Sequence, residues 1–179
     1  MKHINRILLA VLVMSISAAY SQNSDSHQVS ISIPTIALLD IESAGVNDIT
    51  LTMTAPSEAG DGLADQTDNS LWLNVTSIVA TGNTRDISVS VDAVPAGIDL
   101  KVVSAAYSGS GFGSWGSVGG EIKLSTSSQN LVTGIKSGYT LNGENNGYNL
   151  TYTATPNTST FGDLESGNTD ITVTYTLTP

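Results

Sequence analysis

The segment Ile171-Thr172-Val173-Thr174-Tyr175-Thr176-Leu177 decides the fold class, because apolar residues alternate with threonine through its whole length. Successive side chains of a β-strand point to opposite faces, so this period of two gives one apolar and one hydroxyl-rich face. Val29-Ser30-Ile31-Ser32-Ile33 repeats the pattern near the other end of the chain. Strands of this kind, separated by polar turns, indicate antiparallel sheets with an apolar interior.

The same composition recurs along the rest of the chain. Each expected strand is rich in Val, Ile, Leu, Thr or Tyr, and none has a central proline. We therefore predict an all-β fold with little helix, an immunoglobulin-like antiparallel β-sandwich of about ten strands. The expected strands lie near residues 28–33, 36–42, 48–54, 70–78, 85–92, 98–106, 120–124, 129–135, 147–154 and 169–177.

The parity of each expected strand predicts which side chains face the core. Residues 36–41 do not alternate strictly, which predicts a strand buried on both faces or a bulge. The inward set comprises Val29, Ile31, Ile33, Ile49, Leu51, Met53, Leu71, Leu73, Val75, Ile87, Val89, Val91, Ile98, Leu100, Val102, Ile122, Leu124, Tyr148, Leu150, Tyr152, Ile171, Val173, Tyr175 and Leu177.

The first residues have the three-part pattern of a secretory signal peptide. A basic start is followed by an apolar run over residues 7–16 and by the small residues Ala19 and Ser21, at the −3 and −1 positions of a cleavage before Gln22. An uncleaved anchor is the alternative, but the apolar run is short for a membrane span. We predict a signal peptide over residues 1–21 and a single sandwich domain over residues 22–179. The protein is then exported to the periplasm, the cell surface or the extracellular space, with no transmembrane span after cleavage.

Charge and cysteine content exclude several classes of function. The chain has 6 basic and 16 acidic residues, a net charge of −10. Loss of Lys2 and Arg6 with the signal peptide leaves 4 basic against 16 acidic residues, hence −12. Such a surface repels nucleic acids and anionic lipids, so we expect neither as a partner. The chain has no cysteine, which rules out thiol catalysis and thiolate metal sites.

The residues for common enzyme mechanisms are missing. The two histidines are His3, within the expected signal peptide, and His27, near the mature N-terminus. This placement argues against a Ser-His-Asp triad and against a histidine metal site. No Gly-x-Ser-x-Gly elbow and no phosphate-binding Gly-x-x-x-x-Gly-Lys loop occurs. Paired carboxylates of a glycosidase stay an alternative, but we expect no enzyme.

An acidic loop over residues 57–69 is the only candidate metal site. It carries Glu58, Asp61, Asp65 and Asp68. Calcium takes six to eight oxygen ligands, which these carboxylates would supply if the loop curled. The alternative interpretation is a solvated loop, because the spacing is loose and the Asp-x-Asp-x-Asp-Gly pattern is absent. We expect no cofactor, with calcium as the alternative.

A Gly/Ser-rich loop over residues 108–120 carries Phe112 and Trp115. Glycine and serine would let the loop adapt around a ligand, and the two rings would offer a platform on which a sugar stacks. The alternative is that Trp115 folds back and closes one end of the sandwich, since exposed aromatic groups reduce solubility. A glycan is therefore an alternative partner, with Phe112 and Trp115 as ligand-binding candidates.

The terminal strands bear on how such a protein works by contact. Neither residues 28–33 nor residues 171–177 contain a charge, whereas natural edge strands are usually blunted by lysine or proline. Either both strands are interior, or one donates or accepts a strand in an assembly. We expect a non-catalytic structural or adhesive protein that contacts other protein subunits or cell-surface components through strand edges or loops.

Two segments carry a family resemblance. Residues 169–178 (TDITVTYTLT) resemble the closing strand of bacterial pilin-like sandwiches, including spore-coat-protein-U-like and WxL-like secreted domains. Residues 71–77 (LWLNVTS), followed by 82–85 (GNTR), resemble a group of uncharacterised secreted Gram-negative proteins. The resemblance implies an immunoglobulin-like sandwich with a surface or fimbrial role. The chain departs from it by lacking a cysteine pair and a Trp-x-Leu motif, and no functional residue carries over.

Overall fold

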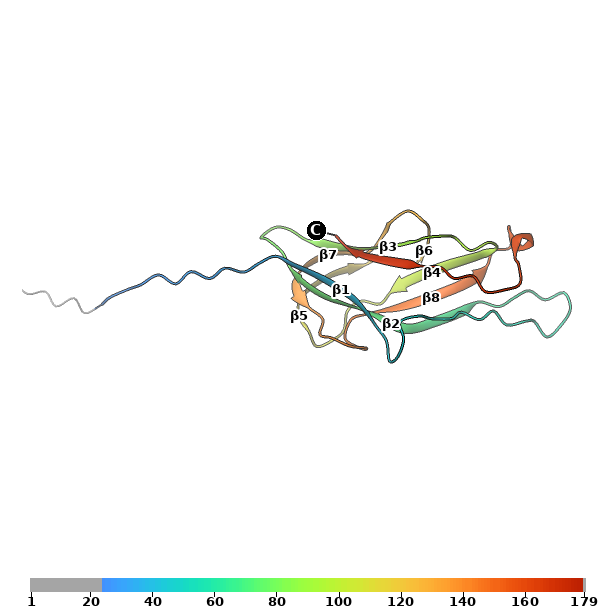
Figure 1. Ribbon diagram of the computed structural model, residues 1–179, viewed down its shortest axis with the longest axis horizontal. Helices are drawn as coiled ribbons and strands as arrows, with labels where there is room; N and C mark the ends of the chain where they lie inside the picture. Colours follow the sequence, from blue (N-terminus) through green and yellow to red (C-terminus); the bar gives the residue numbers. More distant parts are fainter. Residues whose placement is uncertain (1–23, 179) are drawn as a thin grey trace, which may run out of the picture. The chain divides into compact units, whose positions relative to one another are not determined.

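The computed structural model describes residues 24–178. The expected signal peptide, residues 1–21, lies outside the described residues. The chain divides into two units between Ile33 and Pro34. In the first unit, residues 24–33 form an extended stretch with neither strand nor helix (Figure 1). In the second unit, nine strands and one short helical turn surround a common core.

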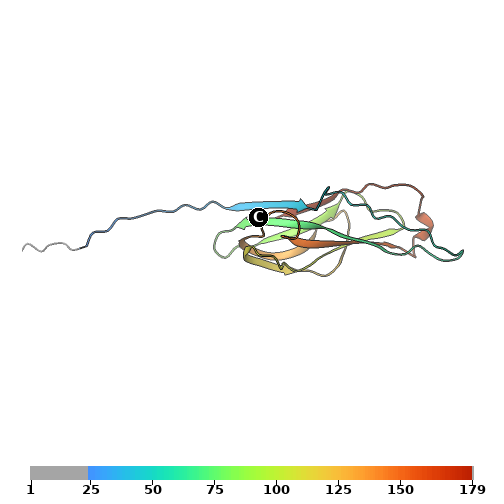
Figure 2. The ribbon, with the colours of Figure 1, turned by 90° about the horizontal axis from the view of Figure 1, so that it is seen from below.

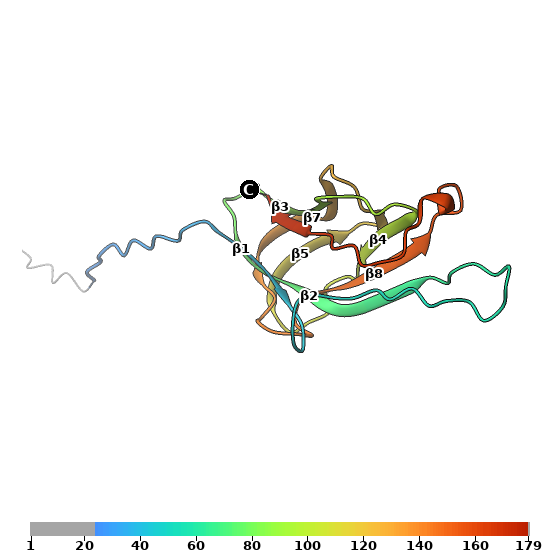
Figure 3. The same ribbon diagram turned by 45° about the vertical axis from the view of Figure 1, so that its right-hand side comes forward.

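The strands form one antiparallel sheet in the order β6-β4-β8-β2-β7-β3-β9, and β1 pairs with β2 and β5 with β7 (Figures 1 and 3). A single 3₁₀ turn, η1, spans Phe161–Asp163. Within residues 24–178 there is no helix with the length and apolar character needed to cross a membrane. The strands are β1 (Ile36–Glu42), β2 (Gln66–Ile78), β3 (Arg85–Val91), β4 (Ile98–Ser104), β5 (Phe112–Val118), β6 (Ile122–Lys123), β7 (Gln129–Tyr139), β8 (Tyr148–Pro156) and β9 (Val173–Leu177).

Strand β2 joins the two halves of this sheet. Its first part pairs with β8, its second part pairs with β1, and only Thr76 and Ser77 pair with β7. Leu71, Leu73 and Val75 of β2 are buried, as their alternation predicts. One continuous strand therefore carries the sheet from β8 to β7 through a junction of two residue pairs.

The sheet folds over itself (Figure 2), and contacts between tyrosine hydroxyls and distant strands measure how closely its halves approach. Three strands lie between β8 and β9 in the sheet order, which would separate them by roughly 19 Å if the sheet were flat. The hydroxyls of Tyr152 on β8 and Tyr175 on β9 are nevertheless 2.5 Å apart. Tyr148 of β8 likewise donates a hydrogen bond to the Trp115 carbonyl of β5. Both halves of the sheet thus pack face to face, which confirms the all-β, sandwich-like prediction.

The core contains side chains from both halves of the folded sheet. Most of the buried apolar residues are ones that strand parity predicts. Leu131, Val132 and Ile135 of β7 and Ala154 of β8 are additional. The buried residues predicted by parity are Leu71, Leu73, Val75, Ile87, Val89, Val91, Val102, Leu124, Tyr148, Leu150 and Tyr152.

Two predicted strands are wrong. Residues 28–33 pair with no strand, and the side chains of Val29, Ile31 and Ile33, which parity places in the core, are 69–83 % exposed. Residues 48–54 also form no strand, although Ile49 and Leu51 pack against the core. Periodicity shows that a segment is fit to be a strand, but a strand also needs a partner for its backbone hydrogen bonds.

Two further predictions concern particular elements. The Gly/Ser-rich segment 108–120, expected to be a loop, contains strand β5. Residues 36–41, expected to be buried on both faces or bulged, lie in β1, which pairs regularly with β2 and leaves Leu38 exposed. The structure corrects the prediction for each of these two segments. Glycine lowers strand propensity, but it does not prevent pairing where a neighbouring backbone comes close.

The tyrosine pair generates a first prediction. Tyr152→Phe or Tyr175→Phe removes one hydroxyl and leaves the other without its partner across the core, which should lower the free energy of unfolding by about 1–2 kcal/mol. The double variant should lose less than the sum of the two, because no orphaned hydroxyl remains. Urea unfolding of the four proteins measures this. Strict additivity would contradict direct contact between the hydroxyls.

Alkaline pH generates a second prediction. Burial raises the pKa of Tyr152 to about 12, and burial also raises the pKa of Tyr148 and Tyr175, the latter further through the charge of Tyr152. The unfolded chain ionises near pH 10. Stability from these groups is therefore complete below pH 10 and decreases as pH rises from 10 toward about 12.

Urea unfolding at stepped pH values tests this dependence, with the Tyr152→Phe/Tyr175→Phe protein as control. The loss of unfolding free energy above pH 10 should be smaller in this variant, because it lacks two of the three phenols whose pKa is raised. Equal slopes in the two proteins would show that other groups cause the alkaline loss.

Candidate functional site

The core is less well closed beside β1 and β9 than elsewhere. These two strands approach each other, and each pairs on one side only within the described residues. Their inward side chains, among them Leu39, Ile41 and Tyr175, are only half-buried, whereas the inward residues of β2, β3 and β8 are buried. We refer to this side of the second unit, defined by β1 and β9, as the open side.

One edge of β9 presents unpaired backbone groups. Asp92 donates its N–H to the Thr172 carbonyl and Thr178 donates to the Asp86 carbonyl, so the even-numbered residues of this segment bond to the β3 side. In an antiparallel pair, successive residues of one strand direct their backbone N–H and C=O groups alternately toward and away from the partner strand. Val173, Tyr175 and Leu177 therefore direct these groups away from β3. Within residues 24–178 no strand pairs with that edge. It can accept another strand.

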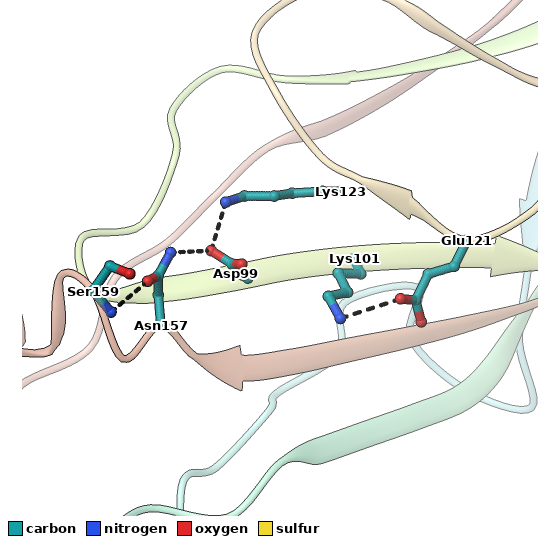
Figure 4. A network of polar contacts seen from close by, with 6 residues as sticks. All are labelled: Asp99, Lys101, Glu121, Lys123, Asn157 and Ser159. Atoms are coloured by element: carbon teal, nitrogen blue, oxygen red, sulfur yellow. Dashed lines mark hydrogen bonds and ion pairs between the residues drawn. The ribbon is translucent and has the colours of Figure 1, made fainter.

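The edge at β6 is instead blunted by charge (Figure 4). Lys123 lies 2.7 Å from Asp99, and Lys101 lies 3.2 Å from Glu121. Asn157 donates a second hydrogen bond to Asp99 at 2.9 Å. These two donors hold the pKa of the Asp99 carboxyl below its usual value, with Lys123 as the larger cause. Lysines and a strand of two residues make β6 a poor template for a further strand.

The edge at β5 is irregular. Gly113 and Gly116 have φ values of 134° and 69°, which side chains rarely adopt. A Cβ atom at Gly113 would lie 2.2 Å from the Cα atom of Gly138 on β7. The register between the strands also shifts between Gly113 and Trp115. Bulges of this kind twist an edge strand and interrupt pairing, so the regular edges are those of β1 and β9.

The acidic residues predicted to bind calcium are spread along the chain. Glu58, Asp61 and Asp65 lie in the connection before β2, and Asp68 lies within β2, where it accepts hydrogen bonds from Ser70. Within residues 24–178 no three His, Asp or Glu side chains gather closely enough to hold a metal ion. Glu58, Asp61 and Asp65 are exposed and Asp68 is half-buried, and the structure does not bring the four carboxylates together.

The two aromatic residues predicted to bind a ligand face opposite sides of the sheet. Trp115 is half-buried, lies opposite Ile135 and stacks on Tyr107 with ring centroids 4.2 Å apart. Phe112 lies beyond the register shift, opposite Tyr139. Residues three apart on a strand face opposite sides, so alternation along β5 turns Trp115 toward the core and Phe112 toward solvent. The register shift instead lets Ile135 and Tyr139, four apart on β7, lie on opposite faces.

Phe112 belongs to a row of side chains on the outer face of the sheet. Leu38 lies opposite Thr76, Thr76 opposite Tyr139, and Tyr139 opposite Phe112, so four neighbouring strands contribute to it. Leu38, Tyr139 and Phe112 are 43–71 % exposed. The ring centroids of Phe112 and Tyr139 are 6.0 Å apart, and their planes are tilted by 48°. We call these four residues the outer row.

A tightly held turn lies next to the outer row. Thr140 is fully buried, and its hydroxyl both accepts from the Val75 N–H and donates to the Leu141 carbonyl. Tyr107 donates its hydroxyl to the Thr140 carbonyl, and Asn74 donates its amide to the Gly143 carbonyl. Leu141 is held between these anchors at φ 82°, a strained value for leucine, with its side chain partly exposed. Strain of this kind often marks functional positions.

Sequence reasoning missed Tyr139, Leu38 and Leu141 as surface features. Tyr139 lies beyond the end of the expected strand 129–135, and Leu38 lies in an aliphatic segment that suggests burial. Their exposure depends on the β2–β7 junction and on the register shift in β5 and β7, neither of which leaves a pattern in one sequence.

Comparison with known proteins returned no match: no family description, no curated protein and no solved structure is significantly similar to this chain.

The strain at Leu141 generates a third prediction. Leu141→Gly and Leu141→Ala both remove the side chain, but only glycine adopts a positive φ without steric cost. The glycine variant should have the larger free energy of unfolding, by about 1 kcal/mol.

Leu38 supplies the matched control, since it is exposed and has no positive φ. There the glycine variant should be less stable than the alanine variant. Urea unfolding measures both pairs. The same order at both positions would contradict strain at Leu141.

Proposed function

We propose that the protein is an exported, non-catalytic structural or adhesive protein, which associates with further copies of itself through strand edges at the cell surface. Two facts together support this proposal. Val29, Ile31 and Ile33 are 69–83 % exposed, and within the described residues no strand covers the open side. The resemblance of residues 169–178 to pilin-like closing strands supports the surface role.

The chemistry of the two elements is complementary. Residues 28–33 present three aliphatic side chains at alternate positions and Ser30 and Ser32 between them. An added strand of this kind would place its aliphatic face over the half-buried residues of the open side and its serines toward solvent. Its backbone would pair with the free N–H and C=O groups of β9. Burial of three aliphatic side chains, at roughly 1.5–3 kcal/mol each, exceeds the cost of ordering a short segment only if the edge also pairs.

A second copy is the partner that these features favour, because one chain carries both the donor segment and the acceptor edge. A contact between unlike surfaces of identical chains is heterologous and leaves one donor and one acceptor free at the ends. Unless two copies exchange the segment reciprocally or the rotation closes a ring, it extends into chains, which suits a structural element outside the cell.

The test compares two charge substitutions on opposite faces of the same segment. Val29→Asp/Ile31→Asp should abolish association, because the aspartates would enter the apolar core. Ser30→Asp/Ser32→Asp adds the same charge to the solvent side and should associate like the unchanged protein. Light scattering during size-exclusion chromatography, over a range of protein concentrations, measures the molar mass. An unchanged protein that stays monomeric at every concentration, or two double variants of equal mass, would contradict the proposal.

Cross-linking locates the contact, since the chain has no native cysteine. Proteins with Ser30→Cys or Ser32→Cys, mixed with Thr174→Cys or Thr176→Cys under oxidising conditions, should form a disulfide-linked dimer in at least one combination. Replacing the β9 cysteine with Ser127→Cys, an exposed position outside β9, serves as the control. Equal cross-linking at Ser127 would place the segment elsewhere.

A further inference from the structure

A shallow groove of about 570 Å³ runs beside the outer row. Leu38, Tyr139 and Leu141 line its apolar part, and Phe112 extends the apolar surface by packing against Tyr139. Exposed apolar groups that gather across several strands, rather than singly, mark contact sites for ligands or partners. The register shift in β5 and the strained turn at Leu141 both hold these side chains outward.

Polar groups converge on the same groove. Asp40, Asn74 and Asn142 line it, and within the described residues no hydrogen bond engages the Asn142 side-chain amide. Asn74 is buried and donates to Gly143, which fixes its side chain, while its Oδ1 atom is enclosed beside Gly147 and does not reach the groove. The side chains of Asn142 and Asp40 are therefore the polar groups that the groove offers to a hydroxyl-bearing ligand.

The balance of charge narrows the class of ligand. Asp40 is the only acidic residue among the described residues that line the groove, and no lysine, arginine or histidine is among them. Phosphates, sulfates and uronates are therefore disfavoured. Ligand sites usually combine an apolar or aromatic wall with a few fixed polar groups. A neutral sugar matches this wall, because its C–H face packs on an aromatic ring while its hydroxyls bond to amides and carboxylates.

We propose that the outer row, together with Leu141, Asn142 and Asp40, forms a binding site for neutral oligosaccharides. Tyr139 and Phe112 carry the stacking surface, and Asn142 and Asp40 bind hydroxyl groups. Trp115, the other candidate from the sequence, is half-buried against Tyr107 on the opposite side of the sheet and is not part of this site. The site is separate from the strand edges of the proposed function and does not depend on residues 24–33.

Affinity electrophoresis of the exported chain tests the site, with soluble neutral polysaccharides (glucans, mannan, galactan, xylan) in the gel and polygalacturonate as the acidic comparison. At least one neutral polysaccharide should retard the protein, and polygalacturonate should not. Tyr139→Ala and Phe112→Ala should each weaken retardation roughly tenfold in affinity. Phe161→Ala, which truncates an equally exposed aromatic side chain on η1, is the matched control.

Each other outcome opposes the proposal. Absence of retardation by every neutral polysaccharide, equal retardation by polygalacturonate, or equal effects of Tyr139→Ala and Phe161→Ala would each overturn it. A changed molar mass in Tyr139→Ala or Phe112→Ala, with retardation unaltered, would assign the outer row to a protein interface instead. The Val29→Asp/Ile31→Asp protein should bind polysaccharide normally. The polysaccharide experiment can therefore be interpreted even if the protein does not self-associate.

Discussion

The sharing of β2 among three partner strands is the constraint on which the rest of the structure depends. Its backbone pairs with β8 over one part and with β1 over another, and only two residue pairs join it to β7. That narrow junction lets the remaining strands fold back as a second layer, while the inward row Leu71, Leu73 and Val75 contributes to a single core. The same junction places Thr76 beside Tyr139 and so assembles the outer row. Fold and surface thus have a common origin.

Side-chain alternation predicts much of this fold and little of its surface chemistry. Residues 71–75 and 87–91 are buried in the parity that their sequence indicates, because burial of one face suffices to specify it. Alternation says nothing about whether a backbone partner exists, which is why residues 28–33 read as a core strand and are exposed. Glycine-rich β5 reads as a loop for the opposite reason, since its pairing depends on the close approach of Gly113 to Gly138.

The candidate sites follow from features that a single sequence does not display. Phe112 and Trp115 are both reasonable ligand-binding residues from their composition, but they lie three apart on β5 and therefore face opposite sides of a sheet whose pairing the sequence does not predict there. Tyr139 is a candidate because it lies opposite Phe112 on the neighbouring strand. The edge of β9 is a candidate because no strand pairs with it within the described residues. Long-range pairing decides each case.

The hydroxyl contact between Tyr152 and Tyr175 has a consequence for where this protein can fold. Extracellular domains often tie their layers together covalently, and they then rely on an oxidising compartment and on enzymes that exchange thiol pairs. Here the tie across the core is a hydrogen bond that forms and breaks reversibly. Native structure should therefore be reached equally well under reducing and oxidising conditions, with no mispaired intermediates to correct.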